Sequence, residues 1–168
     1  PVSGTDDVGG LVGKAEESQI SESFSLAPVH AKGNRAGGLV GGTERVGITD
    51  SSSMGMVSVT GPTLGASLLG DREQHTYLDK AFASGRVTTD PESGSALYPW
   101  TEGRSRKPAI THAFWDVTTT GVADGDDEDP FNGVGLTTPA MKTLATYERV
   151  GWSIAAPSSD AYAWAPWG

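Results

Sequence analysis

Short apolar runs bounded by glycines recur along this chain at a nearly fixed distance. The pentapeptide Gly-Gly-Leu-Val-Gly occupies residues 9–13 and returns at residues 37–41, 28 positions later. A degraded copy lies at residues 65–70, and a fourth, barely recognisable copy at residues 96–100. Self-similarity at such a period is typical of stacked repeats, in which each unit buries its apolar face against its neighbours. The pattern predicts a solenoid.

A second apolar pattern follows each copy. An apolar or aromatic residue comes seven positions after each of Gly13, Gly41, Gly70 and Gly103: Ile20, Ile48, Tyr77 and Ile110. Four positions further comes a small or apolar residue: Phe24, Ser52, Ala81 and Phe114. Short β-prone stretches close the units at residues 28–30, 56–59, 85–89 and 115–118. Each unit should hold about three strands, and Glu22, which interrupts the apolar alternation after Ile20, indicates a bend.

Successive units should pair their strands in parallel, which leaves unpaired edges only at the two ends of the stack. A propeller blade needs about 40 residues, more than these units contain, and a sandwich would not repeat its corner glycines at a fixed step. The sequence therefore predicts an all-β fold. We expect a right-handed parallel β-solenoid of about four coils with a C-terminal helix and an aromatic cap.

The chain changes character near residue 121. We expect residues 1–121 to form the solenoid repeats, and residues 122–168 to add an acidic loop, a short helix and a cap within the same domain. Thr138 suits a helix N-cap, and the proline after it suits the first helical position. This predicts one helix over residues 139–149, closed by Gly151.

The predicted helix has one apolar face, which should pack on the last coil. That face carries Met141, Leu144 and Tyr147. Several aromatic residues follow the helix, as expected of an atypical terminal unit that covers a solenoid end. The first unit has no such cover, and residues 1–4 resemble the close of a unit. We expect upstream repeats or a second protein chain at this open N-terminal end, and association between copies of the chain is compatible with it.

Charge narrows the function classes. The chain has 21 acidic residues against 12 Lys and Arg, a net charge of −9, and no cysteine. Nucleic-acid binding is disfavoured because it needs cations to neutralise phosphates. No apolar run approaches the roughly 18 residues that span a bilayer, so no membrane insertion is predicted. The excess of Asp over Glu and the scarcity of Lys fit a halophilic protein and an ordinary acidic extracellular protein about equally well.

The repeats resemble a known family. Gly-Gly-Leu-Val-Gly followed by an Ile-x-x-Ser strand is similar to the GLUG-motif repeats of bacterial and archaeal surface proteins. The segment Leu-Thr-Thr-Pro-Ala-Met-Lys at residues 136–142 and the Phe-Trp-Asp of residues 114–116 resemble the closing pattern of that family. The resemblance implies a secreted or cell-surface β-solenoid of the kind found in large adhesin-like proteins and beside peptidase domains. It implies no catalytic residues.

Two groups of residues are candidates for ligand binding. Asp124, Asp126 and Glu128 alternate in an acidic loop and could supply the oxygen ligands that Ca²⁺ prefers, although a solvated acidic insertion is the favoured interpretation. The aromatic faces of Trp100, Trp164 and Trp167 could stack on a glycan or contact a partner, and packing within the cap is the alternative.

Other candidates for chemistry are weaker. His30, His75 and His112 lie in different units without metal-ligand spacing, so surface or corner positions are expected. A solenoid face could bring the carboxylates of Glu22 and Asp50 together, but solvated positions are favoured. No catalytic residue and no cofactor other than the weak Ca²⁺ candidate is predicted.

The favoured functional hypothesis is a non-catalytic structural or adhesive β-solenoid, part of an extracellular adhesin, stalk or filament. One alternative is a component of a viral tail fibre or spike that attaches to a host through a receptor or surface glycan. Another is a carbohydrate-binding or glycan-active β-helix, since parallel β-helices host such enzymes. The expected location is extracellular, at a cell or virion surface.

Overall fold

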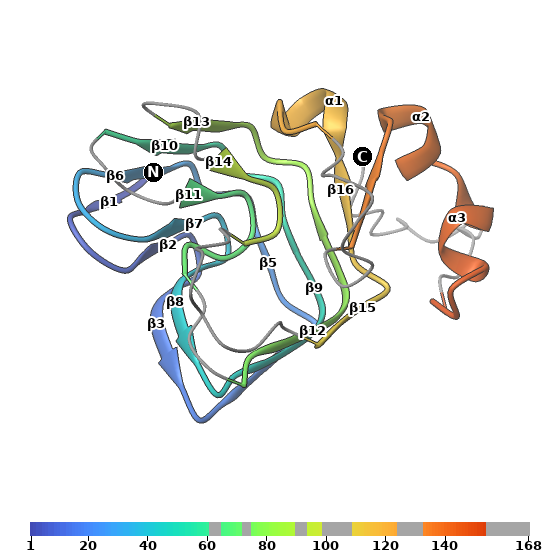
Figure 1. Ribbon diagram of the computed structural model, residues 1–168, viewed down its shortest axis with the longest axis horizontal. Coiled ribbons are helices and arrows are strands. Elements are labelled where there is room, and N and C mark those ends of the chain that lie inside the picture. Colours follow the sequence, from blue (N-terminus) through green and yellow to red (C-terminus); the bar gives the residue numbers. More distant parts are fainter. Residues whose placement is uncertain (61–64, 72–74, 90–93, 99–108, 124–132, 154–168) are drawn as a thin grey trace, which may run out of the picture.

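A computed structural model describes residues 1–60, 65–71, 75–89, 94–98, 109–123 and 133–153. These residues form a parallel β-solenoid of about three turns, followed by strands of an incomplete fourth turn and by three short helices (Figure 1). The predicted all-β solenoid is confirmed. The predicted count of about four coils corresponds to these turns with the incomplete one included.

The turns are built from equivalent short strands, although the number of strands differs from turn to turn. The first turn holds β1 (Val2–Gly4), β2 (Val8–Gly9), β3 (Val12–Glu16), β4 (Gln19–Ser21) and β5 (Phe24–Ser25). The second holds β6 (Val29–Ala31), β7 (Ala36–Gly37), β8 (Val40–Glu44) and β9 (Gly47–Ser53). The third holds β10 (Val57–Val59), β11 (Gly65–Ala66) and β12 (Tyr77–Ala83). Then come β13 (Val87–Thr89), β14 (Gly94–Ser95), β15 (Ala109–Thr111), β16 (Phe114–Asp116) and β17 (Val134–Leu136).

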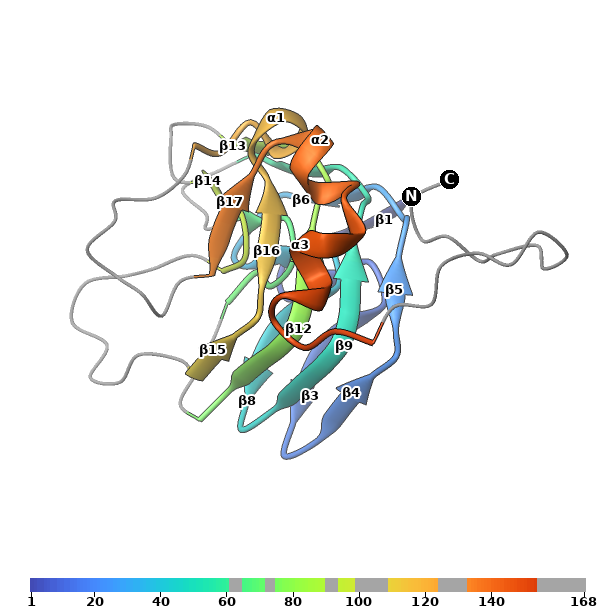
Figure 2. The same ribbon diagram turned by 90° about the vertical axis from the view of Figure 1, so that its right-hand side faces the viewer.

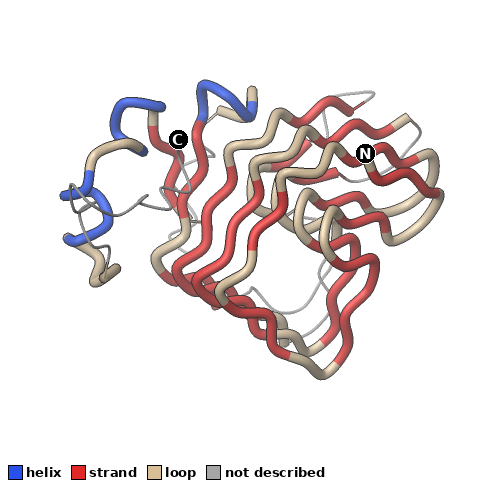
Figure 3. The backbone as a smooth tube through the Cα atoms, turned by 180° about the vertical axis from the view of Figure 1, so that it is seen from behind, coloured by secondary structure: helices blue, strands red, loops and turns tan. Residues whose placement is uncertain are grey.

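Equivalent strands of successive turns pair in parallel and form four sheets. Sheet A has the order β1-β6-β10-β13, and sheet B has the order β2-β7-β11-β14. Sheet C pairs β3 with β8, and sheet D runs β4-β9-β12-β16-β17, with β5 and β15 joined to β9 and β12. Figure 3 shows the strands following one another from turn to turn around the stack. β17 belongs to the predicted cap region, yet it extends sheet D.

The pairing corrects the predicted register of the third turn. Ile20, Ile48, Leu78 and Ile110 occupy one row of sheet D, so Leu78 and not Tyr77 is the inward apolar residue. Likewise Phe82, and not Ala81, lies in the row of Phe24, Ser52 and Phe114. The third turn contains one more residue between its glycine and its sheet D strand than the first two turns contain.

The turns do not lengthen evenly. The step from sheet D to sheet A is ten residues in each turn, from Gln19 to Val29, from Gly47 to Val57 and from Tyr77 to Val87. The step from sheet B to sheet D grows from eleven residues between Ala36 and Gly47 to fifteen between Gly94 and Ala109. One side of the solenoid therefore has a constant length, and the other side does not.

The apolar residues of the repeat fill the interior. Leu39, Leu68 and Leu97, which follow the glycines of successive units, are at most 2% exposed, and they pack with Ile48 and Leu78 of sheet D. A smaller cluster between sheets A and B contains Val29, Ala36, Val57 and Val59. The interior therefore explains why one face of each predicted strand is apolar.

The glycines of the pentapeptide permit close contact between backbones. A Cβ atom on Gly37 would lie 2.0 Å from the carbonyl oxygen of Val40 and 2.4 Å from the amide nitrogen of Gly70. In the third turn, Ala66 pairs with Gly37 in the same row of sheet B. There the described residues form no strand beside β8, and only an isolated bridge joins Val40 to Leu69. The degraded repeat thus coincides with a locally changed backbone.

Charged and polar residues, rather than glycines, occupy the left-handed corner positions. Glu22, Asp50, Lys80 and His112 follow equivalent strands of sheet D, and all have φ between 47° and 54°. The bend predicted after Ile20 is therefore confirmed. Two further rows of corners contain Asp7 and Arg35, and Glu17, Arg45 and His75. A left-handed backbone costs a non-glycine residue about 1 kcal/mol, so the stacked turns must hold these corners in place.

The C-terminal helices differ from the single predicted helix. The structure has α1 (Val117–Thr120), α2 (Thr138–Met141) and α3 (Leu144–Glu148). The end of the predicted closing stretch, residues 117 and 118, is thus helical, with Asp116 accepting N-cap hydrogen bonds from Thr118 and Thr119. The backbone is extended at Thr143, which separates α2 from α3, and the N-cap of α2 is Thr137 instead of Thr138.

Threonine hydroxyls account for the break in the predicted helix. The hydroxyl of Thr143 donates to the carbonyl of Pro139, and that of Thr146 donates to the carbonyl of Ala140. Such bonds compete with the helical backbone pattern. The predicted end is confirmed: Gly151 has φ of 80°, its amide donates to Glu148, and the amide of Trp152 donates to Tyr147.

Val117 of α1 packs against the interior cluster of the solenoid, whereas α2 and α3 cover the outer face of sheet D. Figure 2 shows α3 in front of the strands of this sheet. Met141 and Tyr147 are buried there against Phe82 and Phe114, and the rings of Tyr147 and Phe114 meet edge to face at 5.6 Å. Leu144, predicted to share this buried face, is 36% exposed. Burial raises the pKa of Tyr147, and the charge of Asp116 adds to the effect.

Candidate functional site

The residues proposed from the sequence as ligand contacts cannot be placed. They lie outside the described residues: Asp124, Asp126, Glu128, Trp100, Trp164 and Trp167. The calcium and glycan hypotheses therefore stay predictions. In the described part of the chain, no three His, Asp or Glu side chains are grouped so that they could hold a metal ion.

The other candidates lie at the surface. His30 is exposed in β6, while His75 and His112 lie at exposed left-handed corners, as expected. Glu22 and Asp50 do occupy neighbouring positions in successive turns, because the preceding residues Ser21 and Thr49 are paired. Both carboxylates are exposed corner residues, which agrees with solvated positions.

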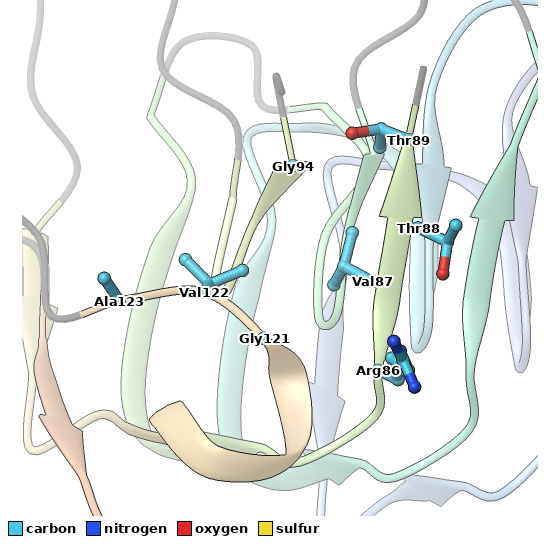
Figure 4. Close-up of a pocket in the computed structure, with 8 residues that line it drawn as sticks. All are labelled: Arg86, Val87, Thr88, Thr89, Gly94, Gly121, Val122 and Ala123. Atoms are coloured by element: carbon cyan, nitrogen blue, oxygen red, sulfur yellow. The ribbon is translucent and has the colours of Figure 1, made fainter. Parts of the chain in front are cut away.

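A shallow depression lies between β13 and the segment after α1 (Figure 4). Its volume is about 440 Å³, and its lining comes from residues 86–89, 94 and 121–123. Arg86 is the one titratable side chain among the described lining residues, and the remainder are glycine, alanine, valine and threonine. This set lacks the paired acid and base that proton transfer requires, so the depression does not favour catalysis.

Charged side chains link one turn to the next at the corners. Arg35 of the second turn lies 2.6 Å from Asp7 of the first turn and 3.5 Å from Asp71 of the third. Arg45 of the second turn lies 2.7 Å from Glu17 of the first. Both first-turn partners are 28 residues from their arginines, so the pairs follow the repeat. Hydrogen bonding to Glu17 raises the pKa of Arg45.

A third link joins the third turn to the incomplete fourth. Asp79 accepts a hydrogen bond from the hydroxyl of Thr111 at 2.8 Å, and one of its oxygens lies 2.9 Å from Nδ1 of His112. Burial tends to raise the pKa of Asp79, but the hydrogen bonds from His112 and Thr111 outweigh it, so the pKa lies below its ordinary value. The corner contacts thus continue along the stack.

One aromatic residue spans three turns. The hydroxyl of Tyr77 in the third turn donates to Oε1 of Gln19 in the first turn at 2.8 Å. The ring passes over Gly47 of the second turn, where a Cβ atom would lie 2.3 Å from the ring and 2.2 Å from the Gln19 oxygen. The glycine between them is therefore needed for this contact.

The first-turn face of the stack has the composition of an interior left open. Leu11 is 49% exposed, although Leu39, Leu68 and Leu97 at the equivalent positions are buried. Val12 and Ile20 are half-buried, whereas Val40 and Ile48 are fully buried. The left-handed corners of this turn, Asp7, Glu17 and Glu22, are all acidic. We call this surface, centred on Leu11, Val12 and Ile20 and bounded by these three carboxylates, the first-turn face.

The first-turn face is the candidate functional site. The sequence indicated an open N-terminal end, but not its acidic corners. The sequence does contain a signal for these corners, because acidic residues of the first unit are followed by arginines 28 positions later. The spacing of apolar residues does not reveal these charge pairs.

Comparisons with known proteins leave the family open. No family model matches the chain, and neither a curated protein nor a solved structure is found to be significantly similar to it. Among the described residues, no helix is long and apolar enough to cross a membrane. The GLUG-motif resemblance therefore stays a hypothesis that rests on the sequence motifs alone.

Proposed function

We propose that the chain is a non-catalytic structural module of an extracellular surface protein, serving as a stalk, filament segment or adhesin scaffold. The observation that supports this most directly is the continuous stack of turns tied by contacts that follow the repeat. Arg35 joins three successive turns at one corner, and Tyr77 reaches across three turns on another side. Such links suit an element that keeps a fixed length.

The packing of the turns supports the same role. In a solenoid, stability is approximately a sum of the stabilities of single turns and of contacts between neighbouring turns. Here those contacts combine backbone pairing in sheets A, B and D, pairing in sheet C between the first two turns, a shared apolar interior and the corner charges. A stack of this kind resists bending because any bend must open at least one of its sheets.

Distance measurements test the structural role. The chain has no cysteine, so Ser3→Cys and Thr88→Cys place spin labels at exposed, outward positions of β1 and β13. These positions are three strand spacings apart, or about 14 Å between backbones. The pair His30→Cys and Thr88→Cys is the matched control at two spacings, about 10 Å. Narrow distributions that differ by one spacing are expected, and broad ones would contradict a rigid stack.

The surface location and the adhesive part need separate tests. Antibodies against the chain should label intact cells of the source organism without permeabilisation, and label that appears only after permeabilisation would contradict the proposal. Binding on a glycan array that is lost on Trp100→Ala, Trp164→Ala or Trp167→Ala would favour the carbohydrate-binding alternative. A stable three-fold assembly of the native chain would favour the viral fibre.

A further inference from the structure

The first-turn face presents an apolar centre that its own turn does not cover. Leu11, Val12 and Ile20 occupy the rows that Leu39, Val40 and Ile48 fill in the second turn, where all three are completely buried. The first turn thus leaves apolar side-chain area in water that the second turn buries, and burial of apolar area is the main favourable term in association. A surface with this composition favours contact with another apolar surface.

The backbone of the same face is prepared for parallel pairing. Within the described residues, β1, β2, β3 and β4 pair with the second turn on one side and with no strand on the other. Exposed parallel edges present rows of amide and carbonyl groups to a further strand. Because the free edges of all four strands run in the same direction, a partner can pair with all of them only if it has a turn with four equivalent strands.

The charges indicate which turn fits. Residues 1–28 contain five carboxylates and one lysine, whereas residues 29–56 contain three basic residues (Lys and Arg) and two acidic ones. At two corners an arginine of the second turn forms an ion pair with an acidic residue of the first turn, Arg35 with Asp7 and Arg45 with Glu17. Arg35 also shows that one arginine can lie between carboxylates of two turns, since it contacts both Asp7 and Asp71. If acidic and basic corners alternate from turn to turn, a turn on the other side of the first turn should also carry basic residues at these corners.

A second copy of the chain fits the face poorly. Two first-turn faces in contact would bring Asp7, Glu17 and Glu22 of both copies together, and like charges placed opposite one another are destabilising. A copy that docked through its far end would offer α1 after β16, where the other turns continue to a strand of sheet A. Within the described residues, neither arrangement provides four strand rows with basic corners.

We propose that the first-turn face docks a further solenoid turn in parallel register, and that this turn carries arginine or lysine at the corners that meet Asp7 and Glu17. The inference rests on the proposed structural role, since it names the partner that would continue the stack. Its apolar residues would bury Leu11, Val12 and Ile20, and its strands would pair with β1 to β4.

A fusion to the full chain tests this inference. Residues 29–55 are joined directly before Pro1, so that Pro1 takes the place of Met56 ahead of Val2, which is equivalent to Val57 through their shared row in sheet A. The added turn then brings its copies of Arg35 and Arg45 to Asp7 and Glu17. The matched control carries Arg35→Glu and Arg45→Glu in the added turn only. Hydrogen exchange of the amides of β1, β3 and β4 is measured together with the thermal midpoint.

Docking should slow exchange in β1, β3 and β4 by about tenfold or more, since these amides then open only with the stack. The charge-reversed control should lose most of this slowing. Unchanged exchange in the fusion would overturn the docking of a further turn, and equal slowing in both fusions would overturn the requirement for basic corners. If the unmodified chain dimerises and protects the same strands, the face belongs to a second copy and the inference is wrong. Broad spin-label distances would instead contradict the structural role itself.

Discussion

Replacing Gly37 by alanine tests whether the repeated glycines are needed for space. The φ angle of Gly37 is not left-handed, so alanine can adopt its backbone conformation and the effect isolates packing. Its Cβ would lie 2.0 Å from the Val40 oxygen and 2.4 Å from the Gly70 nitrogen, and both atoms belong to the backbone. Overpacking against a fixed backbone costs about 1–3 kcal/mol. Weakening the 2.9 Å hydrogen bond from Gly70 to Val40 adds about 1 kcal/mol.

The expected loss for Gly37→Ala is therefore about 3 kcal/mol, or roughly 10 °C in the thermal midpoint for a chain of this length. Gly151→Ala is the matched control, because that glycine has φ of 80° and, its chain neighbours aside, no atom of the described residues lies within 4 Å of the place that an alanine Cβ would take. Its cost should be about 1 kcal/mol from backbone conformation alone. Both are measured by thermal and urea unfolding. Equal shifts in the two variants would refute the argument that close backbone contact requires Gly37.

Three further predictions concern polar contacts. Arg35→Met should lower the free energy of unfolding, measured in urea, by about 2–3 kcal/mol, because it leaves the partly buried carboxylates of Asp7 and Asp71 without this partner. Arg45→Met removes a solvent-exposed ion pair and should cost clearly less, so equal costs would contradict the argument. Asp79→Asn should destabilise at neutral pH, because the lowered pKa means that the carboxylate contributes stability above about pH 4. The difference from the unchanged protein should shrink as the pH falls through the folded-state pKa, and a difference that grows on acidification would be decisive against this. Ser53→Ala should be neutral or stabilising by about 1 kcal/mol, since the buried Ser53 hydroxyl has no hydrogen-bond partner among the described residues and Ala83 occupies the same row; a loss above about 1 kcal/mol would show that the hydroxyl is bonded.

The stacked architecture was predictable because its physical requirement is written in apolar and glycine positions. An interior shared between turns demands the same residue class at the same step, and the pentapeptide at residues 9–13 and 37–41 meets that demand. The closing of the last helix by Gly151 was predictable for a similar reason, since few residues accept its backbone conformation. These features depend on local residue types.

The register of the third turn was not predictable from spacing. Its additional residue lies between Gly70 and β12, and a fixed step therefore selects Tyr77 where the structure places Leu78. The division of the predicted helix depends on the hydroxyls of Thr143 and Thr146, which a period of apolar residues does not reveal.

The candidate site was predicted only as an open end. Its acidic corners depend on left-handed backbones at Glu17 and Glu22, where charged residues stand in conformations that usually favour glycine. These left-handed conformations are set by the position of a residue in the repeat rather than by its type. A search for opposite charges at the 28-residue step would have found the pairs of Asp7 with Arg35 and Glu17 with Arg45.

The constant ten-residue step from sheet D to sheet A divides the surface into two kinds of territory. Along this step the chain has one permitted length, so a single insertion there would shift every following strand out of pairing. Between sheets B and D the length already varies from turn to turn while the strands on both sides stay paired. Foreign peptides, epitopes or affinity tags should therefore be accommodated on the variable side, turn by turn, at spacings set by the strands themselves.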